Sequence, residues 1–157
     1  MQAEEAPAVH IVGIGPGAEF DYLTEAAQGV RFVFHPGVGS LQAPLAKLGL
    51  EHASAEEGTP MAVYAPGRDT DAEAQARIEG LCSLKIPLAF FLADDALSQI
   101  LEAGARHFGA NGRVVIGHRI GWPDEWTLDT TFDALHRQCS PMVIPRHSLI
   151  LVGPWNG

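Results

Sequence analysis

The sequence predicts an α/β protein, because short apolar runs typical of strands alternate with segments whose apolar residues recur at helical spacing. The composition agrees: 46% hydrophobic and 18% charged residues in a chain of 157 are typical of a globular protein that buries one core. A glycine-rich turn at residues 13–17 separates the first apolar run from a helical pattern. Such a turn at the end of a strand predicts a place where a ligand approaches the backbone.

The strands are predicted from runs of Val, Ile, Phe and Leu bounded by turn residues, and the helices from apolar faces at three- and four-residue spacing. The clearest helical face is Leu97, Ile100, Leu101, Ala105 and Phe108. The predicted strands are 9–14, 31–35, 60–65, 88–92, 113–116, 125–129 and 148–152. The predicted helices are 20–29, 40–48, 71–81, 94–108 and 131–138.

A polar stretch at 51–58 divides the chain. We expect a disordered tail at 1–8, an N-terminal βαβ piece with a connecting helix at 9–50, and a C-terminal α/β domain at 59–154. The N-terminal piece has too few elements to cover both faces of a parallel strand pair. Its apolar residues are therefore predicted to bury against the C-terminal domain or against a second copy of the chain.

Charge and cysteine usage exclude several classes of protein. A net charge of −9 argues against non-specific nucleic-acid binding, which requires a basic surface.

The longest apolar run, 88–93, is too short to cross a bilayer, and the acidic first residues lack the apolar core of a secretory signal. Cys82 and Cys139 form no C-x-x-C pair, so we expect a cytoplasmic protein with reduced, buried thiols. The seven histidines show no metal-ligand spacing, so no metal is predicted.

The glycine turn differs from a dinucleotide fingerprint. Its spacing is G-x-G-P-G rather than G-x-G-x-x-G, and the next predicted strand ends in His35 and Pro36 with no carboxylate for a ribose hydroxyl. A tight strand-to-helix turn without a ligand remains an alternative.

The same segment resembles the opening of the tetrapyrrole methylases, which use S-adenosylmethionine to methylate precorrins and uroporphyrinogen. The residues that carry this resemblance are Gly13, Gly15, Pro16, Gly17, Leu23 and Thr24. Residues 35–50 are similar to the family's P-G-V-S-S connection and helix, with Gly39 in place of the first serine and Ser40 matching the second. Residues 87–153 are similar to its C-terminal domain. The W-P-D-E turn at 122–125 and the Gly-Arg-Asp turn at 67–69 are nearest the precorrin-4 C(11)-methyltransferase branch.

The resemblance implies a C-methyltransferase of corrin (cobalamin) biosynthesis that binds S-adenosylmethionine and a precorrin and forms a homodimer. It implies cofactor contacts at Pro36, Gly37, Ser40, Leu92 and Ala93. It implies substrate contacts at Gly13, Gly15, Pro16, Gly17, Thr24 and Arg119. Because precorrins carry many carboxylates, candidate basic residues for the cleft are Arg68, Arg113, Arg119 and Arg146, each of which is equally well an ordinary surface arginine.

One difference from the family leaves two functions open for this chain. In the family a long segment with a G-D-P motif lies between the first helix and P-G-V-S-S, whereas here residues 29–34 lead directly into His35 and no G-D-P occurs. The resemblance therefore predicts a truncated N-terminal βα unit followed by a C-terminal mixed-sheet α/β domain. The alternative to a methyltransferase is a non-catalytic, shortened paralogue that binds a ligand or a partner chain.

Several polar residues have both a functional and an ordinary interpretation. His118 and Arg119 follow a predicted strand and could touch substrate, or they could be a solvated strand end. Asp124 and Glu125 could be a carboxylate pair, but W-P-D-E is also typical of a type I turn with Pro at its second position. Ser40 lies where a helix N-cap is expected.

Overall fold

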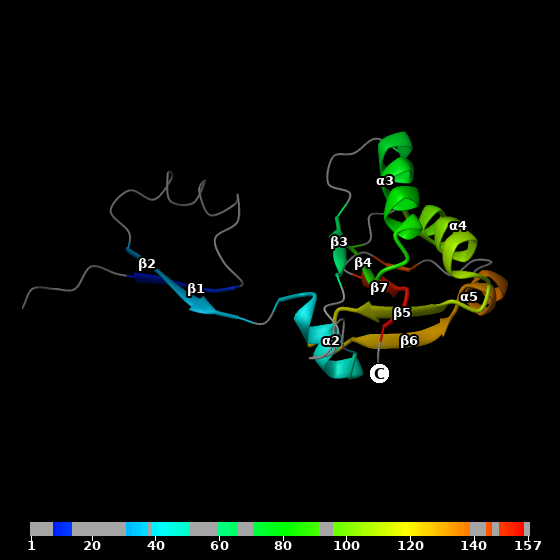
Figure 1. The fold of residues 1–157 in the computed structure, drawn as a ribbon. Helices are drawn as coiled ribbons and strands as arrows, with labels where there is room; N and C mark the ends of the chain where they lie inside the picture. The colour runs from blue at the N-terminus through cyan, green and yellow to red at the C-terminus, as the bar shows by residue number, and fades with distance from the viewer. Residues whose placement is uncertain are drawn as a thin grey trace, which may run out of the picture. The chain divides into compact units, whose positions relative to one another are not determined.

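The structure, a computed structural model, describes residues 8–13, 31–37, 39–50, 60–65, 71–91, 96–138, 144–145 and 148–155. The chain divides into two compact units, Met1–Gln42 and Ala43–Gly157 (Figure 1). The predicted tail at 1–8 lies outside the described residues except for Ala8, the first residue of the first strand. The predicted helix at 20–29 lies outside the described residues.

The first unit contains two parallel strands. β1 (Ala8–Gly13) pairs with β2 (Arg31–Pro36) over their whole length. The register sets Ala8 opposite Arg31 and Gly13 opposite Pro36, so both strands end at the same side of the pair. Within the described residues these two strands form a sheet of their own.

The second unit is built on a five-stranded mixed sheet with the order β3-β4-β7-β5-β6 (Figure 1). Its strands are β3 (Ala62–Tyr64), β4 (Leu88–Phe91), β5 (Arg113–His118), β6 (Trp126–Thr131) and β7 (Ser148–Val152). β3 and β4 are parallel, and the remaining neighbours are antiparallel. The predicted mixed-sheet α/β architecture is confirmed.

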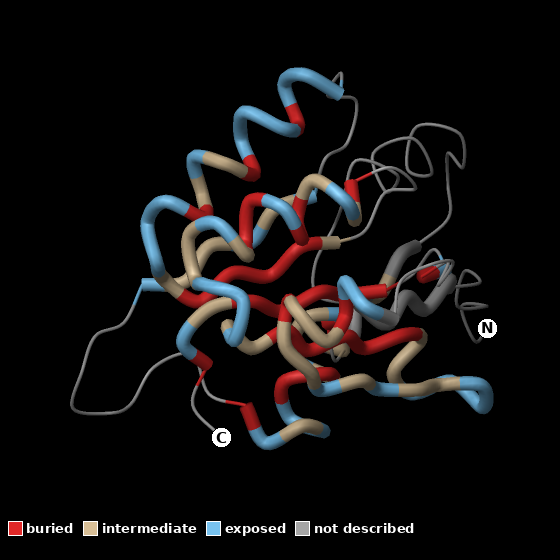
Figure 2. Tube along the Cα trace, turned by 90° about the vertical axis from the view of Figure 1, so that its right-hand side faces the viewer, coloured by how far each residue is buried: buried red, intermediate tan, exposed pale blue. Residues whose placement is uncertain are grey.

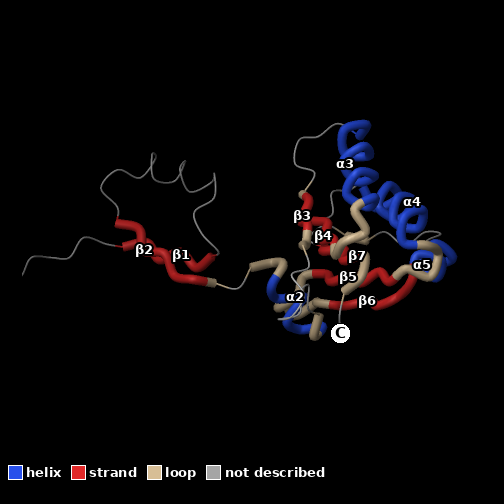
Figure 3. The backbone as a smooth tube through the Cα atoms, viewed as in Figure 1, coloured by secondary structure: helices blue, strands red, loops and turns tan. Residues whose placement is uncertain are grey.

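Helices α3 (Asp71–Ser83), α4 (Ala96–Phe108) and α5 (Phe132–Gln138) pack against the sheet (Figure 3). Alternate residues of the three central strands contribute to the same buried cluster as these helices, as strand geometry requires for side chains on one face. That cluster includes Leu88, Phe90, Val114, Ile116, Ile150 and Val152 from the strands and Ile78, Ile100, Phe132 and Leu135 from the helices. Figure 2 shows the buried strands crossing the centre and the exposed outer sides of the helices.

Helix α2 (Gln42–Leu48) lies against the opposite face. Gly117 follows Ile116, whose side chain belongs to the buried cluster, so the Cα of Gly117 faces the other side of the sheet. A Cβ added to Gly117 would lie 3.6 Å from the Pro44 Cβ. This is ordinary van der Waals distance, so α2 packs against the sheet near the end of β5. Pro44 and Leu45 are the buried residues of the helix.

The element boundaries differ from the predicted ones where tertiary pairing extends or shortens a strand. β5 continues two residues past the predicted end at 116, because Gly117 and His118 pair with both β6 and β7. β3 is only three residues long, because its pairing with β4 covers Ala62–Tyr64. No described helix is long and apolar enough to span a membrane.

Candidate functional site

Pairing register gathers several strand ends at one edge of the sheet. β4 ends at Phe91, whose partner Leu149 is the second residue of β7. β5 ends at His118, whose partner Ser148 is the first residue of β7. β3 is parallel to β4 and ends at the same side. We call this side, where β3, β4 and β5 end, the carboxyl edge; in α/β sheets such an edge is where ligands bind.

The connection from β5 to β6 forms two consecutive turns at the carboxyl edge. The Trp122 N–H donates to the Arg119 carbonyl over 2.9 Å, and the Glu125 N–H donates to the Trp122 carbonyl over 3.1 Å. Gly121 has φ +91°, a conformation that side chains rarely adopt. The second turn is the one predicted from W-P-D-E, with Pro123 at its second position.

Arg119 combines an unusual backbone conformation with two side-chain contacts. Its φ of +46° lies in the left-handed region, which is strained for a residue with a Cβ. The guanidinium lies 4.3 Å from the centre of the Trp122 ring and forms an ion pair with Asp124. Trp122 itself is 58% exposed. The structure therefore presents a cation and an indole together at the carboxyl edge.

An open groove of about 570 Å³ runs beside these turns. Its lining comes from α2 and from the β5–β6 connection: Ala43, Lys47, Ile120, Gly121, Trp122, Pro123 and Glu125. Lys47 forms an ion pair with Glu125, which also accepts a hydrogen bond of 2.7 Å from the Gly121 N–H. Because Glu125 pairs with Lys47 and Asp124 with Arg119, the two carboxylates do not form a shared pair.

His118 is a buried polar residue at the carboxyl edge, with 7% of its surface exposed. Its Nδ1 lies 3.0 Å from the Ser148 Oγ, and its ring stacks on Trp126 at 5.4 Å between ring centres. The interpretation of His118 as a solvated strand end is therefore wrong. The sequence could not reveal the link to Ser148, because the two residues are 30 positions apart and meet only through the β5–β7 pairing.

The other residues singled out from the sequence are only partly described. Gly13 and Pro36 are register partners at the ends of β1 and β2; Gly37 follows directly, and Ser40 is exposed just before α2. Six lie outside the described residues: Gly15, Pro16, Gly17, Thr24, Leu92 and Ala93. The roles assigned to all of these residues remain predictions.

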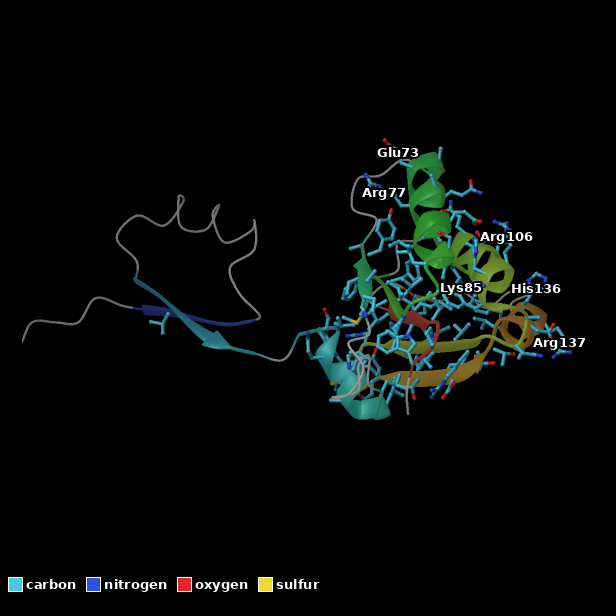
Figure 4. The ribbon with its side chains drawn as sticks, in the orientation of Figure 1. Glu73, Arg77, Lys85, Arg106, His136 and Arg137 are labelled. Carbon is cyan, nitrogen blue, oxygen red and sulfur yellow. The ribbon has the colours of Figure 1, made fainter. Side chains whose placement is uncertain are left out.

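Of the remaining candidate arginines, the structure describes Arg113. Arg113, the first residue of β5, lies at the opposite end of that strand, where it pairs with Asp129 at 2.8 Å. Arg68 and Arg146 lie outside the described residues. Figure 4 shows other basic side chains on α3 to α5, among them Arg106 and Arg137, which pair with Glu79 and Asp133. Of the two described candidates, Arg113 and Arg119, the structure therefore places Arg119 at the carboxyl edge.

Metal and thiol chemistry find no support in the part of the chain that is described. It contains no group of three or more His, Cys, Asp or Glu side chains arranged to hold a metal ion. Cys82 is fully buried in α3, and burial together with the nearby charge of Glu79 raises the pKa of its thiol to about 11. Such a thiol is not a nucleophile at neutral pH, as expected of a packing residue. Cys139 lies outside the described residues.

Residues 17–136 match the family model of the tetrapyrrole (corrin/porphyrin) methylases. Two curated relatives are precorrin-4 C(11)-methyltransferases: one from a Sinorhizobium species is 28% identical over 80% of this chain, and one from Pseudomonas aeruginosa is 27% identical over 87%. The chain spans about half the length of these relatives, 50% and 54%.

Solved structures show the same fold. A cobalt precorrin-4 methyltransferase aligns with a TM-score of 0.65 and 24% identity over 86% of this chain and 56% of its own. A uroporphyrin-III C-methyltransferase from Thermus thermophilus, solved as a complex with S-adenosyl homocysteine, aligns with a TM-score of 0.55 and 16% identity over 85% of this chain and 57% of its own.

Proposed function

The chain belongs to the tetrapyrrole methylase family, and on that premise we propose that it is an S-adenosylmethionine-dependent C-methyltransferase that acts on a corrin precursor in cobalamin biosynthesis. The observation that carries the proposal is the family match over residues 17–136, which includes the whole β5–β6 connection at the carboxyl edge. The precorrin-4 relatives support the choice of substrate class.

The residues at the carboxyl edge suit a reaction that depends on positioning. The cofactor would supply a methyl group already activated by a positive sulfur, so the protein has to orient the reactants and exclude water. A cation–π pair such as Arg119 on Trp122 can bind a flat, carboxylate-bearing macrocycle, with the indole against its face and the guanidinium at a carboxylate. Asp124 holds that guanidinium in place.

We assign cofactor contacts to Pro36, Gly37, Ser40, Leu92 and Ala93, and substrate contacts to Gly13, Gly15, Pro16, Gly17, Thr24 and Arg119. The matching ends of β1 and β2 at Gly13 and Pro36 support this grouping, because ligand-binding turns follow the ends of parallel strands. The relative from T. thermophilus that holds S-adenosyl homocysteine supports the choice of cofactor. The family likeness also suggests a homodimer, for which a monomer in sedimentation at micromolar concentration would be contrary evidence.

The second candidate is a non-catalytic module that binds cofactor, tetrapyrrole or a partner chain without turnover. The observation in its favour is that, within the described residues, β1 and β2 pair only with each other, although parallel strands are usually buried within larger sheets. The absence of the family's G-D-P motif from the sequence points the same way.

Calorimetric titration with S-adenosylhomocysteine is the first test. We expect micromolar binding near one per chain or one per dimer, and loss of that binding in Gly15→Val, whose side chain would obstruct the glycine turn. The matched control is Gly80→Ala, since a Cβ at Gly80 would have no heavy atom within 4 Å.

Turnover distinguishes the two candidates. Incubation with S-adenosylmethionine and precorrin-4 should yield a product heavier by one methyl substitution, detected by mass spectrometry. Binding without any product would favour the non-catalytic module, and absence of binding at millimolar ligand would contradict the cofactor assignment.

A further inference from the structure

The groove beside the β5–β6 connection combines an apolar lining with an ion pair. Its apolar side chains come from α2 and from the connection: Ala43, Ile120, Trp122 and Pro123. Its charged lining residues are Lys47 and Glu125. The groove belongs to the second unit, which begins at Ala43. Its volume of about 570 Å³ is in the range of small-molecule sites, so the lining can receive part of a ligand.

The ion pair in this groove holds its cation only in part. Lys47 on α2 pairs with Glu125, and the two side chains are 48% and 27% exposed, so water screens the pair and it stabilises the fold little. The Lys47 ammonium carries three N–H donors, and Glu125 Oε1 accepts one of them. The other oxygen of Glu125 accepts from the Gly121 N–H over 2.7 Å. A ligand carboxylate can therefore bind Lys47 while Glu125 stays on the Gly121 backbone.

A second cation lies beside the same indole. The Arg119 guanidinium is 4.3 Å from the centre of the Trp122 ring, and its Nη1 donates to Asp124 Oδ2. A guanidinium has five N–H donors, so one bond to Asp124 leaves it able to bind a further carboxylate. The groove thus offers a ligand two cations, one from α2 and one from the β5–β6 connection, together with one exposed aromatic face.

We propose that Lys47 binds a second peripheral carboxylate of the corrin precursor, besides the one assigned to Arg119, and that Glu125 competes with the substrate for this ammonium; the inference rests on the proposed function. The precursor carries carboxylates around its rim, and the two cations and the indole match such a ligand in charge and shape. Two anchors from different elements restrict rotation of the macrocycle over Trp122, whereas one anchor would not. Such orientation determines which carbon faces the methyl group.

Two substitutions that break the same ion pair should change binding in opposite directions. Lys47→Met keeps an apolar stem and removes the cation. Glu125→Gln removes the negative charge and keeps an amide oxygen that can accept from the Gly121 N–H. The probe is uroporphyrin III, a stable tetrapyrrole with carboxylate side chains on every ring, titrated spectrophotometrically into the full chain. We expect it to bind Lys47→Met about fivefold more weakly than the wild type, and Glu125→Gln about threefold more tightly.

Matched controls separate a local effect from a change in net charge. Arg137→Met in α5 and Glu102→Gln in α4 change the charge by the same amounts, and both side chains are exposed on helices that cover the other face of the sheet. Their affinities for uroporphyrin III should stay within about 1.5-fold of the wild type, because salt screens distant charges. Since Lys47→Met and Glu125→Gln remove the same exposed pair, both should shift the thermal unfolding midpoint by about 3 °C at most.

Each outcome decides for or against the inference. If the pair only held α2 in place, both variants would bind uroporphyrin III more weakly; that result, or unchanged affinity in both, would overturn the inference and leave the proposed function standing. Equal shifts in the controls would also overturn it. The sign measured with Glu125→Gln decides by itself if Lys47→Met does not fold.

The wild type separates the inference from the proposed function. A wild type that bound S-adenosylhomocysteine but not millimolar uroporphyrin III would overturn the inference and leave the cofactor assignment standing. Binding of neither ligand would overturn the proposed function as well.

Discussion

The two ends of the β5–β6 pair are held in different ways. At the end where β5 begins and β6 finishes, Phe132 is 1% exposed and fills the space left by Gly104 and Gly112. A Cβ at Gly104 would lie 2.3 Å from the Phe132 ring, and one at Gly112 would lie 2.9 Å from it. We call this the packed end. No side chain larger than hydrogen fits at its two glycines without moving the ring.

The carboxyl edge, at the other end of the same strands, is held by polar contacts and turns. Arg119 and Gly121 both have positive φ, Trp122 is exposed, and the ion pairs of Arg119 and Lys47 lie at the surface. Contacts of this kind contribute little to stability and can be exchanged for ligand contacts. The difference teaches that one end of a strand pair supplies stability, while the other presents two ion-paired cations and an exposed indole for binding.

The largest expected effect is at the packed end. Gly104→Ala should destabilise the protein by about 3 kcal/mol, because the new methyl group overlaps the Phe132 ring and cannot be accommodated without strain. Urea unfolding measures the loss. A shorter side chain at 132 should relieve the overlap, so Gly104→Ala combined with Phe132→Leu should be less destabilised than the sum of the two changes.

Gly80→Ala is the control for this substitution. It lies in α3 with nothing within 4 Å of the added Cβ, so helix propensity alone should stabilise the protein by about 0.5–1 kcal/mol. If Gly104→Ala were equally harmless, tight packing would no longer distinguish this end from the carboxyl edge.

A smaller effect compares two residues with left-handed backbone. Lys85, after α3, has φ +54°, and Arg119 has φ +46°. Lys85→Gly should stabilise the protein by about 1 kcal/mol, because glycine adopts this conformation without strain and the exposed lysine side chain contributes little. Arg119→Gly should give no net gain, because relief of strain is offset by loss of the contacts with Asp124 and Trp122.

Unfolding midpoints of the two variants, measured under the same conditions, provide the comparison. An equal gain in both would mean that the side-chain contacts of Arg119 do not compensate for its strain. Its role at the carboxyl edge would then need independent support from binding.

The smallest expected effect is pH-dependent. The Arg113 guanidinium, by hydrogen bonding and by its charge, holds the pKa of Asp129 below its usual value. Since the folded-state pKa is below the unfolded one, the pair stabilises the fold above about pH 4, and the contribution is lost as pH falls through the folded-state pKa. Asp129→Asn should cost only a few tenths of a kcal/mol at neutral pH, because both side chains are partly exposed.

Urea unfolding of wild type and Asp129→Asn at neutral and at acidic pH checks this expectation. The difference between the two proteins should shrink as the pH falls, and a difference that grew instead would contradict the sign. Arg113→Gln should reproduce the change at neutral pH, apart from its weaker contact with the Trp155 carbonyl.

The sequence by itself determined the secondary structure of the second unit and its α/β class. Apolar periodicity located α3, α4, α5 and the strands to within a few residues, because hydrophobic patterning follows local geometry. The local sequence also predicted one turn: W-P-D-E indicated the turn that is closed by the hydrogen bond from the Glu125 N–H to the Trp122 carbonyl. Glycine is a poor helix former, and only packing explains Gly104 in the middle of α4, since the Phe132 ring occupies the place of its side chain.

Only the tertiary structure decided what the polar residues at the carboxyl edge do. Strand order and antiparallel register bring Ser148 to His118 and extend β5 past its predicted end. The same arrangement pairs Lys47 with Glu125, 78 positions away. These contacts depend on long-range pairing, in which a shift of one residue moves every side chain to the other face. A local pattern carries no information about that register, so sequence could name His118 and Arg119 as candidates but could not say what holds them.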